Sequence, residues 1–280
     1  MAPPRKPPRT TSPIQHANLL IDDAVQLGPP IFLVGASGGK DSQCTLHLVC
    51  EARKRHPALQ VGALYWYRVP DIDCMERPIR ETCERLGVPL YRVPHDLLCG
   101  ALIGAINREF TVETNEVPAL KVVDLELAGK VRFAAHLSGI PEREIFDDQG
   151  KVRVSLKDFR VNPFGIWMAY GHRQNESLER KGMLSGFRNQ LNEFGVKSGG
   201  RLGFDPKSRR IYPLATWDRK NALTYVRHFH LPLAESFGRG DTSGLDPNNP
   251  EVLRYLRDRY PEDFARVVRL FPRVAGLLNQ

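Results

Sequence analysis

The stretch Ile31-Phe-Leu-Val-Gly-Ala-Ser-Gly-Gly-Lys-Asp-Ser42 decides the fold of this chain. A short apolar run rich in branched side chains ends in a glycine turn, and a segment compatible with a helix follows from Gln43 to Arg55. This order predicts a β-strand, a tight loop and the N-terminus of a helix. We therefore expect an α/β unit whose loop lies at the carboxyl end of a strand.

The composition of this loop suits a phosphate group. The start of a helix presents unpaired backbone N–H groups and the positive end of the helix dipole. Gly38 and Gly39 carry no Cβ, so the backbone can approach an anion closely. Lys40 adds a positive charge, and Ser37 and Ser42 add hydroxyl groups. The loop is therefore predicted to bind the phosphates of ATP or pyrophosphate, although a glycine turn that only starts a helix is the plain alternative.

The stretch is not the common P-loop. That motif requires a glycine where Val34 stands, and a serine or threonine where Asp41 follows Lys40. An aspartate in a phosphate loop repels the phosphates unless a cation bridges them. We therefore expect Mg²⁺ between Asp41 and the phosphates.

Ser37-Gly-Gly-Lys-Asp-Ser42 after an apolar strand resembles the SGGxDS pyrophosphate loop of the adenine nucleotide alpha hydrolase-like superfamily, the PP-loop ATP pyrophosphatases. Members typically split ATP between the α- and β-phosphates and transfer AMP to an acceptor. The resemblance implies catalytic roles for Lys40 and Asp41, with Asp41 as the metal ligand. It also implies a nucleotide-binding loop made of Ala36, Ser37, Gly38, Gly39, Lys40, Asp41 and Ser42.

A second polar stretch, Gly171-His-Arg-Gln-Asn-Glu-Ser-Leu-Glu-Arg180, follows the apolar run 164–170. Two guanidiniums near a strand end, on Arg173 and Arg180, would grip a tetrahedral anion with paired hydrogen bonds. Glu176 would hold one arginine by an ion pair, or would only form an i,i+4 surface pair on a helix. His172 is a candidate proton shuttle, and the neighbouring arginines are expected to keep it neutral.

This second stretch resembles the G-x-R-x-x-[DE]-S-x-x-R pattern of the PAPS reductase-like branch of the same superfamily. Val131-Arg132, Gly139-Ile140 and the run 167–173 look most like the phage and bacterial type of that branch. The resemblance covers roughly residues 31–237. It implies that Arg173 and Arg180 are catalytic and that four residues contact the nucleotide: Gly171, Arg173, Glu176 and Ser177.

The sequence departs from the reductase pattern in the segment 238–246. PAPS reductases use a cysteine near the C-terminus, whereas Gly238-Arg-Gly-Asp-Thr-Ser-Gly-Leu-Asp246 contains none. A thiol nucleophile and an iron–sulfur cluster are therefore unsupported there, and reductase activity is in doubt. Arg239, Asp241 and Ser243 are weaker site candidates, because the reductase tail folds over the site at this position.

Composition narrows the class of protein. A net charge of +8 over 280 residues suits anionic ligands such as nucleotides, sulfate or nucleic acid. No apolar run approaches the ~20 residues that span a bilayer. The N-terminal residues 1–9 lack the apolar core of a secretory signal. Five cysteines without a Cys-x-x-Cys pair fit neither a disulfide framework nor a zinc site, so we expect a cytoplasmic protein with no membrane partner.

Alternating apolar runs predict an α/β fold with parallel βαβ units. We expect a Rossmann-like, HUP-type, three-layer α/β/α architecture with a roughly five-stranded, mainly parallel sheet in the order 3-2-1-4. The expected strands are 31–35, 60–67, 88–93, 164–170 and 210–213, and the expected helices are 12–26, 43–55, 74–86, 121–139, 217–229, 250–260 and 261–271. The predicted regions are a disordered basic arm (1–13), a nucleotide-binding domain (14–237) and a helical C-terminal extension (238–280).

Two further features lie near the predicted site. Tyr65 and Trp66 end the second strand, where they would cover the adenine ring or pack in the core. The segment Lys197-Ser-Gly-Gly-Arg201 would close over phosphate or form an exposed turn.

Three functions remain open from the sequence. The first is an enzyme that uses ATP and Mg²⁺ to adenylylate an anionic acceptor. The second is a PAPS or adenylyl-sulfate reductase, or another protein that binds PAPS. The third is the nucleotide-binding module of a DNA-modification complex, in which the basic arm contacts nucleic acid.

Overall fold

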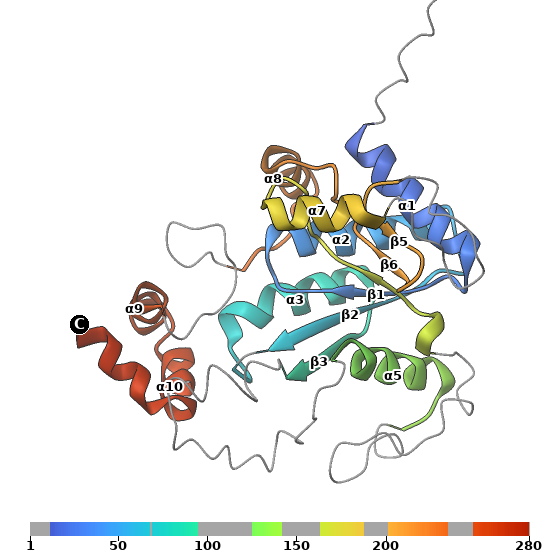
Figure 1. Cartoon of the computed structure of the whole chain (residues 1–280). Helices are drawn as coiled ribbons and strands as arrows, with labels where there is room; N and C mark the ends of the chain where they lie inside the picture. The colour runs from blue at the N-terminus through green and yellow to red at the C-terminus, as the bar shows by residue number, and fades with distance from the viewer. Residues whose placement is uncertain are drawn as a thin grey trace, which may run out of the picture.

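The computed structural model describes residues 12–67, 69–94, 125–141, 163–187, 201–234 and 249–279. These residues form a six-stranded sheet in the order β3-β2-β1-β4-β6-β5 (Figure 1). Four neighbouring pairs are parallel, and β5 runs antiparallel to β6. The strands are β1 (Ile31–Gly35), β2 (Gln60–Tyr67), β3 (Leu90–Pro94), β4 (Trp167–Ala169), β5 (Phe204–Asp205) and β6 (Arg210–Ile211).

Helices cover both faces of this sheet, which confirms the three-layer α/β/α prediction (Figure 1). The α-helices are α1 (Pro13–Leu27), α2 (Lys40–Glu51), α3 (Asp73–Leu86), α5 (Leu125–Ser138), α7 (Leu178–Gly186), α8 (Arg219–His228), α9 (Pro250–Arg259) and α10 (Pro261–Leu270). Alternate residues of β1 point to opposite faces: Phe32 and Val34 pack with α1, α2, α3 and α8, and Leu33 packs with α5. Short 3-10 helices are η1 (Ala52–Lys54), η4 (Pro163–Gly165) and η6 (Pro272–Asn279).

The central strand β1 sets the position of the site. All five of its residues are buried, as expected for a parallel strand with helices on both faces. It pairs with β2 on one side and β4 on the other, and Val34 is in register with both Ala63 and Ala169. The predicted 3-2-1-4 order is therefore confirmed. The strand order reverses between β1 and β4, so the segments that follow these two strands lie side by side where such sheets bind ligands.

The structure differs from the sequence prediction at the sheet's edge. The expected strand 164–170 is split, because Pro163–Gly165 forms a 3-10 turn and only Trp167–Ala169 pairs as a strand. Two-residue β5 was not expected, so the described sheet has six strands rather than roughly five. The arm 1–11, the segment 197–200 and the candidates Arg239, Asp241 and Ser243 lie outside the described residues.

The C-terminal helices have an apolar core of their own. Residues of α9 and α10, among them Leu253 and Val267, pack with Ile72 and Met75 at the start of α3. In Figure 1 these helices lie beyond the ends of β2 and β3. The two predicted helices are confirmed, while the predicted boundary at residue 238 lies outside the described residues. No described helix combines the length and the apolar character that a bilayer span requires.

Candidate functional site

The loop between β1 and α2 has a backbone conformation that favours glycine at one position. Gly38 has φ +74°, and a Cβ there would lie 3.0 Å from Ala234 Cβ and 3.1 Å from the Met75 carbonyl oxygen. The Ala36 N–H donates to the Leu64 carbonyl at 2.8 Å, which ties the loop to the end of β2. Ser37 is exposed at the tip.

A serine brace holds the loop closed on the helix. The Ser42 hydroxyl donates to the Gly39 carbonyl at 2.9 Å and accepts from both the N–H and the hydroxyl of Ser37, each at 3.1 Å. Gly39 is the N-cap of α2 and supplies no side-chain hydrogen bond to it. The first turn of α2 therefore keeps its N–H groups and its positive dipole end for a ligand.

A row of alternating charges joins this loop to the second polar stretch. Lys40 Nζ lies 3.1 Å from Asp41 Oδ2, and Arg173 Nε lies 3.0 Å from Asp41 Oδ1. The Arg173 Nε–Asp41 Oδ1 contact is an ion pair without the alignment of a hydrogen bond. Arg173 Nη2 lies 3.1 Å from Glu176 Oε1, and Arg180 pairs with the same carboxylate. Three cations and two anions thus alternate across the site, leaving one net positive charge.

Arg173 is the buried centre of this row, with 5% of its surface exposed. Its backbone N–H also donates to Glu176 Oε2 at 3.1 Å. The two carboxylates offset the cost of burying the Arg173 guanidinium, and the buried guanidinium in turn holds both carboxylates in place. The structure thus places Arg173 where it orients Asp41, while Arg180 is the more exposed guanidinium, with 40% of its side chain in solvent.

The backbones of the two stretches also touch. A Cβ on Gly171 would lie 2.7 Å from both the carbonyl carbon and the carbonyl oxygen of Asp41. Because backbone atoms cannot give way, this position requires glycine. Two stretches 130 positions apart along the sequence therefore lie in contact, as the predicted sheet order implied.

Ser177 and Glu176 have local partners. The Ser177 hydroxyl accepts from the Arg180 N–H at 3.1 Å and so caps α7. The i,i+4 ion pair between Glu176 and Arg180 that the sequence suggested is present, and Glu176 holds Arg173 in addition. Contact of Ser177 or Glu176 with a nucleotide stays a prediction.

Aromatic rings line the neighbouring strand ends. Trp66 from β2 stacks on Tyr170 after β4, with ring centroids 6.0 Å apart. A Cβ on Gly35 would lie 2.9 Å from Tyr170 Cδ1 and 3.2 Å from Trp66 Cζ3, so glycine at the end of β1 lets the two rings meet. Tyr65 is buried in the main core, whereas Trp66 is only half-buried. Of the predicted pair, Trp66 is therefore the one that remains a candidate for contact with a base.

His172 lies inside this aromatic group. Its ring stacks on Tyr170 at 5.7 Å and on Tyr212 at 5.5 Å. Burial, together with the nearby Arg180 charge, lowers the pKa of His172 to about 4. The neutral form expected from the sequence agrees with this environment, although burial is the larger cause.

The metal and thiol chemistry of the site is restricted. Within the described ranges, His, Cys, Asp and Glu side chains form no group of three that could hold a metal ion. Asp41 supplies one carboxylate, which fits an Mg²⁺ ion held mainly by phosphate oxygens. Four described cysteines are free and buried: Cys44, Cys50, Cys74 and Cys83. Burial raises the pKa of both Cys50 and Cys83 to about 12, so these thiols are poor nucleophiles.

Sequence reasoning missed the contact from the segment after α8. The Ala234 N–H donates to the Gly38 carbonyl at 2.8 Å, and its methyl group packs against Gly38. No composition signal marks Ala234, because an alanine in an irregular segment carries no recognisable chemistry.

Comparison with known proteins adds resemblances of fold. No protein-family model and no curated protein matches the chain. The structure is similar to the U34-tRNA thiolase NcsA from Methanococcus maripaludis with its [4Fe-4S] cluster, at TM-score 0.42 and 16% identity over 94% of this chain and 78% of that one. It is also similar to the NMN synthetase from Francisella tularensis, at TM-score 0.41 and 13% identity over 94% of both chains. A third similar structure is the phosphoadenylyl-sulfate reductase from Candida auris in a phosphate complex, at TM-score 0.39 and 13% identity over 78% of this chain and 82% of that one. Because these identities and scores are low, they carry no argument about activity, and the function has to be inferred from the site itself.

Proposed function

We propose that this protein is a PP-loop enzyme that binds ATP at residues 36–42, cleaves it between the α- and β-phosphates and transfers AMP to an anionic acceptor. The observation that supports this most is the N-terminus of α2, which has no side-chain cap and begins with Lys40. The ion pair between Asp41 and Arg173 joins this helix start to the second polar stretch, residues 171–180. A helix start with free N–H groups and a mobile cation suits the β- and γ-phosphates.

Each residue of the charged row has a proposed part. Lys40 would exchange its contact with Asp41 for a phosphate oxygen, and Asp41 is the residue that would hold Mg²⁺. The metal, when bound, neutralises charge that develops on the departing pyrophosphate. Arg173 keeps Asp41 in place, because it is buried between that carboxylate and Glu176. Arg180, with its larger exposure, faces the acceptor.

The proposed reaction needs no nucleophile from the protein. An oxygen of the acceptor attacks the α-phosphorus, and the bond from that phosphorus to the bridging oxygen breaks. The bridging oxygen leaves with the bond's electron pair as part of pyrophosphate. Catalysis then rests on positioning and on charge stabilisation.

Pyrophosphate release from ATP labelled at the α-phosphorus tests this proposal. Wild-type protein with Mg²⁺ is expected to release pyrophosphate and to transfer label to one member of an acceptor panel of sulfate, phosphate esters, carboxylates and nucleic acids. Asp41→Asn is expected to slow release by about 100-fold or more, as losses of charged transition-state contacts do. Asp22→Asn, which changes an aspartate paired with Arg55 far from the loop, is the matched control and should retain activity. Equal release by wild type and Asp41→Asn would contradict the proposal.

The reductase alternative gains no support from the described cysteines, which are buried and have raised pKa values wherever a shift is resolved. Including PAPS with a thiol reductant in the same assay decides between the two, because only reduction yields sulfite.

A further inference from the structure

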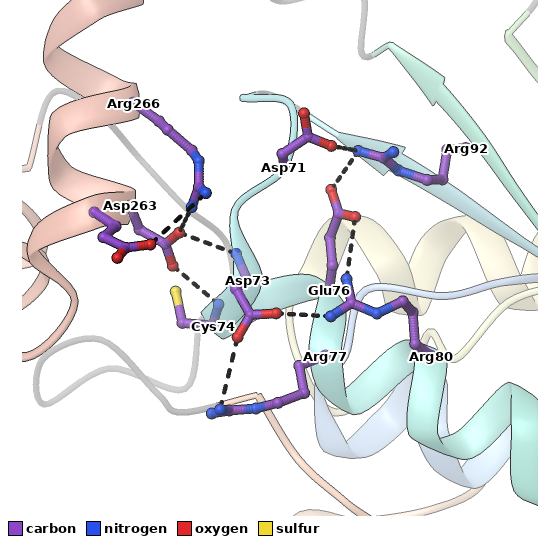
Figure 2. A network of polar contacts seen from close by, with 10 residues as sticks. Asp71, Asp73, Cys74, Glu76, Arg77, Arg80, Arg92, Asp263 and Arg266 are labelled. Atoms are coloured by element: carbon purple, nitrogen blue, oxygen red, sulfur yellow. Dashed lines mark hydrogen bonds and ion pairs between the residues drawn. The ribbon is translucent and has the colours of Figure 1, made fainter.

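Helix α3 starts without a side-chain cap of its own. Its N-cap residue is Ile72, whose side chain has no oxygen to accept a hydrogen bond. Asp263, in the first turn of α10, fills this place: its Oδ1 accepts from the Asp73 N–H at 3.1 Å and its Oδ2 accepts from the Cys74 N–H at 3.0 Å (Figure 2). A carboxylate 190 positions further along the chain therefore does the work of an N-cap.

The environment of Asp263 shows that this contact is built into the fold. Only 2% of its surface is exposed. Arg266 Nη1 lies 2.7 Å from Asp263 Oδ1, so the buried carboxylate has three donors (Figure 2). Apolar side chains surround the contact, including Ile72 and Met75 on one side and Val267 on the other. Such a buried charge is costly unless every partner is in place, so its geometry is fixed.

The first turn of α3 in turn contacts the candidate ATP loop. Asp263 holds the N–H of Cys74, and the carbonyl oxygen of the next residue, Met75, would lie only 3.1 Å from a Cβ at position 38. A second tie runs between the two helices, because Gln43 Nε2 donates to the Pro78 carbonyl at 3.1 Å in a buried position. Displacement of the α3 start would therefore reach both the loop and the helix that follows it.

A separate ion pair holds the other side of this turn. Glu76, buried in the first turn of α3, pairs with Arg92 on β3 at 2.9 Å (Figure 2). Arg92 also pairs with Asp71 at 2.8 Å. Glu76 ties α3 to the sheet, whereas Asp263 ties it to the C-terminal helices.

We propose that Asp263 is a positioning residue for the ATP-binding loop. By capping α3 from α10, it fixes the Met75 carbonyl against Gly38 and so keeps residues 36–42 in the shape that receives phosphate. This inference rests on the proposed function for its effect on ATP binding. The restraint on the loop itself is independent of any ligand.

The test compares Asp263→Asn and Asp263→Ala with a matched control. Asp263→Asn retains one acceptor, and Asp263→Ala removes both. Asn249→Ala is the control, because it removes an exposed N-cap contact of 2.9 Å within the same C-terminal helices and leaves α3 untouched. Urea unfolding measures the overall stability of each variant. The effects on the loop can then be compared between variants after allowing for any loss of unfolding free energy.

Two measurements are then made on the full-length proteins. Amide hydrogen exchange is expected to speed up by about ten-fold at residues 36–43 and 72–76 in Asp263→Ala, less in Asp263→Asn, and not in Asn249→Ala. The dissociation constant of ATP with Mg²⁺, measured by calorimetry, is expected to rise by about ten-fold in Asp263→Ala and to stay within two-fold of wild type in Asn249→Ala.

The outcomes separate the two proposals. If Asp263→Ala and Asn249→Ala change loop exchange equally for an equal loss of stability, Asp263 is only structural and the inference is overturned. If the wild-type protein binds no ATP, the proposed function fails, and loop exchange alone decides whether Asp263 restrains residues 36–43. If Asp263→Ala does not fold, Asp263→Asn is measured in its place, and unchanged exchange and affinity there overturn the inference.

Discussion

Two helices begin at the carboxyl ends of neighbouring strands, and their N-termini differ in whether a side chain caps them. Helix α2 follows β1 and α3 follows β2, and these strands are parallel neighbours. Both helix starts offer free N–H groups and a positive dipole end. Gly39 leaves the start of α2 without a side-chain cap, whereas Asp263 fills the start of α3 with a buried carboxylate.

The difference shows what makes a helix start a candidate anion site. At the start of α3 the N–H groups of Asp73 and Cys74 are already bound by Asp263, and the acids of its first turn, Asp73 and Glu76, are paired with arginines. Helix α2 pairs its own acid, Asp41, with both Lys40 and Arg173, so positive charge remains in excess there. A glycine turn before a helix is therefore informative only together with the groups that reach it from elsewhere.

Converting the α2 start into a copy of the α3 start should have the largest effect. Gly39 has φ −76° and ψ 161°, a backbone conformation that other residues adopt and that suits an N-cap aspartate. We expect Gly39→Asp to weaken ATP binding by about 100-fold, because a carboxylate then occupies the phosphate position. The unfolding free energy should stay the same or rise by a few tenths of a kcal/mol.

Gly39→Asn controls for size and for capping without the charge. It should weaken binding far less than Gly39→Asp in a calorimetric titration. If both variants bind ATP as wild type does, the start of α2 is not the phosphate site and the contrast between the two helices has no functional meaning.

Acid should lower the unfolding free energy through His172, which lies between Gly171 and Arg173. His172 adjoins Gly171 and Arg173, and burial lowers its pKa to about 4 from an ordinary value near 6.5. Between these two values the unfolded chain binds a proton that the folded protein does not, so stability is complete above pH 6.5 and is lost as the pH falls towards 4. We expect this to amount to about 2 kcal/mol, allowing for partial contact with water.

The measurement is urea unfolding of wild type and His172→Gln at pH 7.5 and pH 4.5. The difference between the two proteins removes the contribution of other titrating groups. Wild type should lose more stability than His172→Gln on acidification. A parallel loss in both would show that His172 titrates normally.

The tie between the two helix starts should have the smallest effect. Gln43→Met removes the hydrogen bond to the Pro78 carbonyl from a site that is 2% exposed, and should cost about 1 kcal/mol of unfolding free energy. Combined with Asp263→Asn in a double-mutant cycle, it should show a coupling of about 0.5 kcal/mol or more, because both contacts hold α3 against the loop. Strict additivity would mean that the two helix starts are independent.

The central strands could be predicted from the sequence because their apolar runs are bounded by clear turn signals. The bounds of β1 and β2 are those expected, at 31–35 and 60–67. The run before the second polar stretch was harder to interpret, since apolarity alone does not separate the 3-10 turn at Pro163–Gly165 from the strand that follows. Strand β5 has two residues, which is too short for a periodic signal to exist.

The contacts between distant segments could not be predicted residue by residue. The sheet order places residues 36–42 beside residues 171–180, but nothing in the sequence pairs Arg173 with Asp41 rather than with a ligand. Asp263 follows Pro261 in the first turn of its own helix, where an acid is expected for local reasons. Its reach to α3 depends on tertiary packing, which periodicity does not encode.

The long sequence separation between Asp263 and the helix it caps bears on how the protein is made. A ribosome that has released residues up to 250 has already produced every described strand, yet the first turn of α3 still waits for its acceptor. We expect the nascent chain to hold a sheet whose loop 36–42 lacks this restraint until α10 emerges. A chain interrupted before residue 263 would then contain every described strand but lack the carboxylate that holds the first turn of α3.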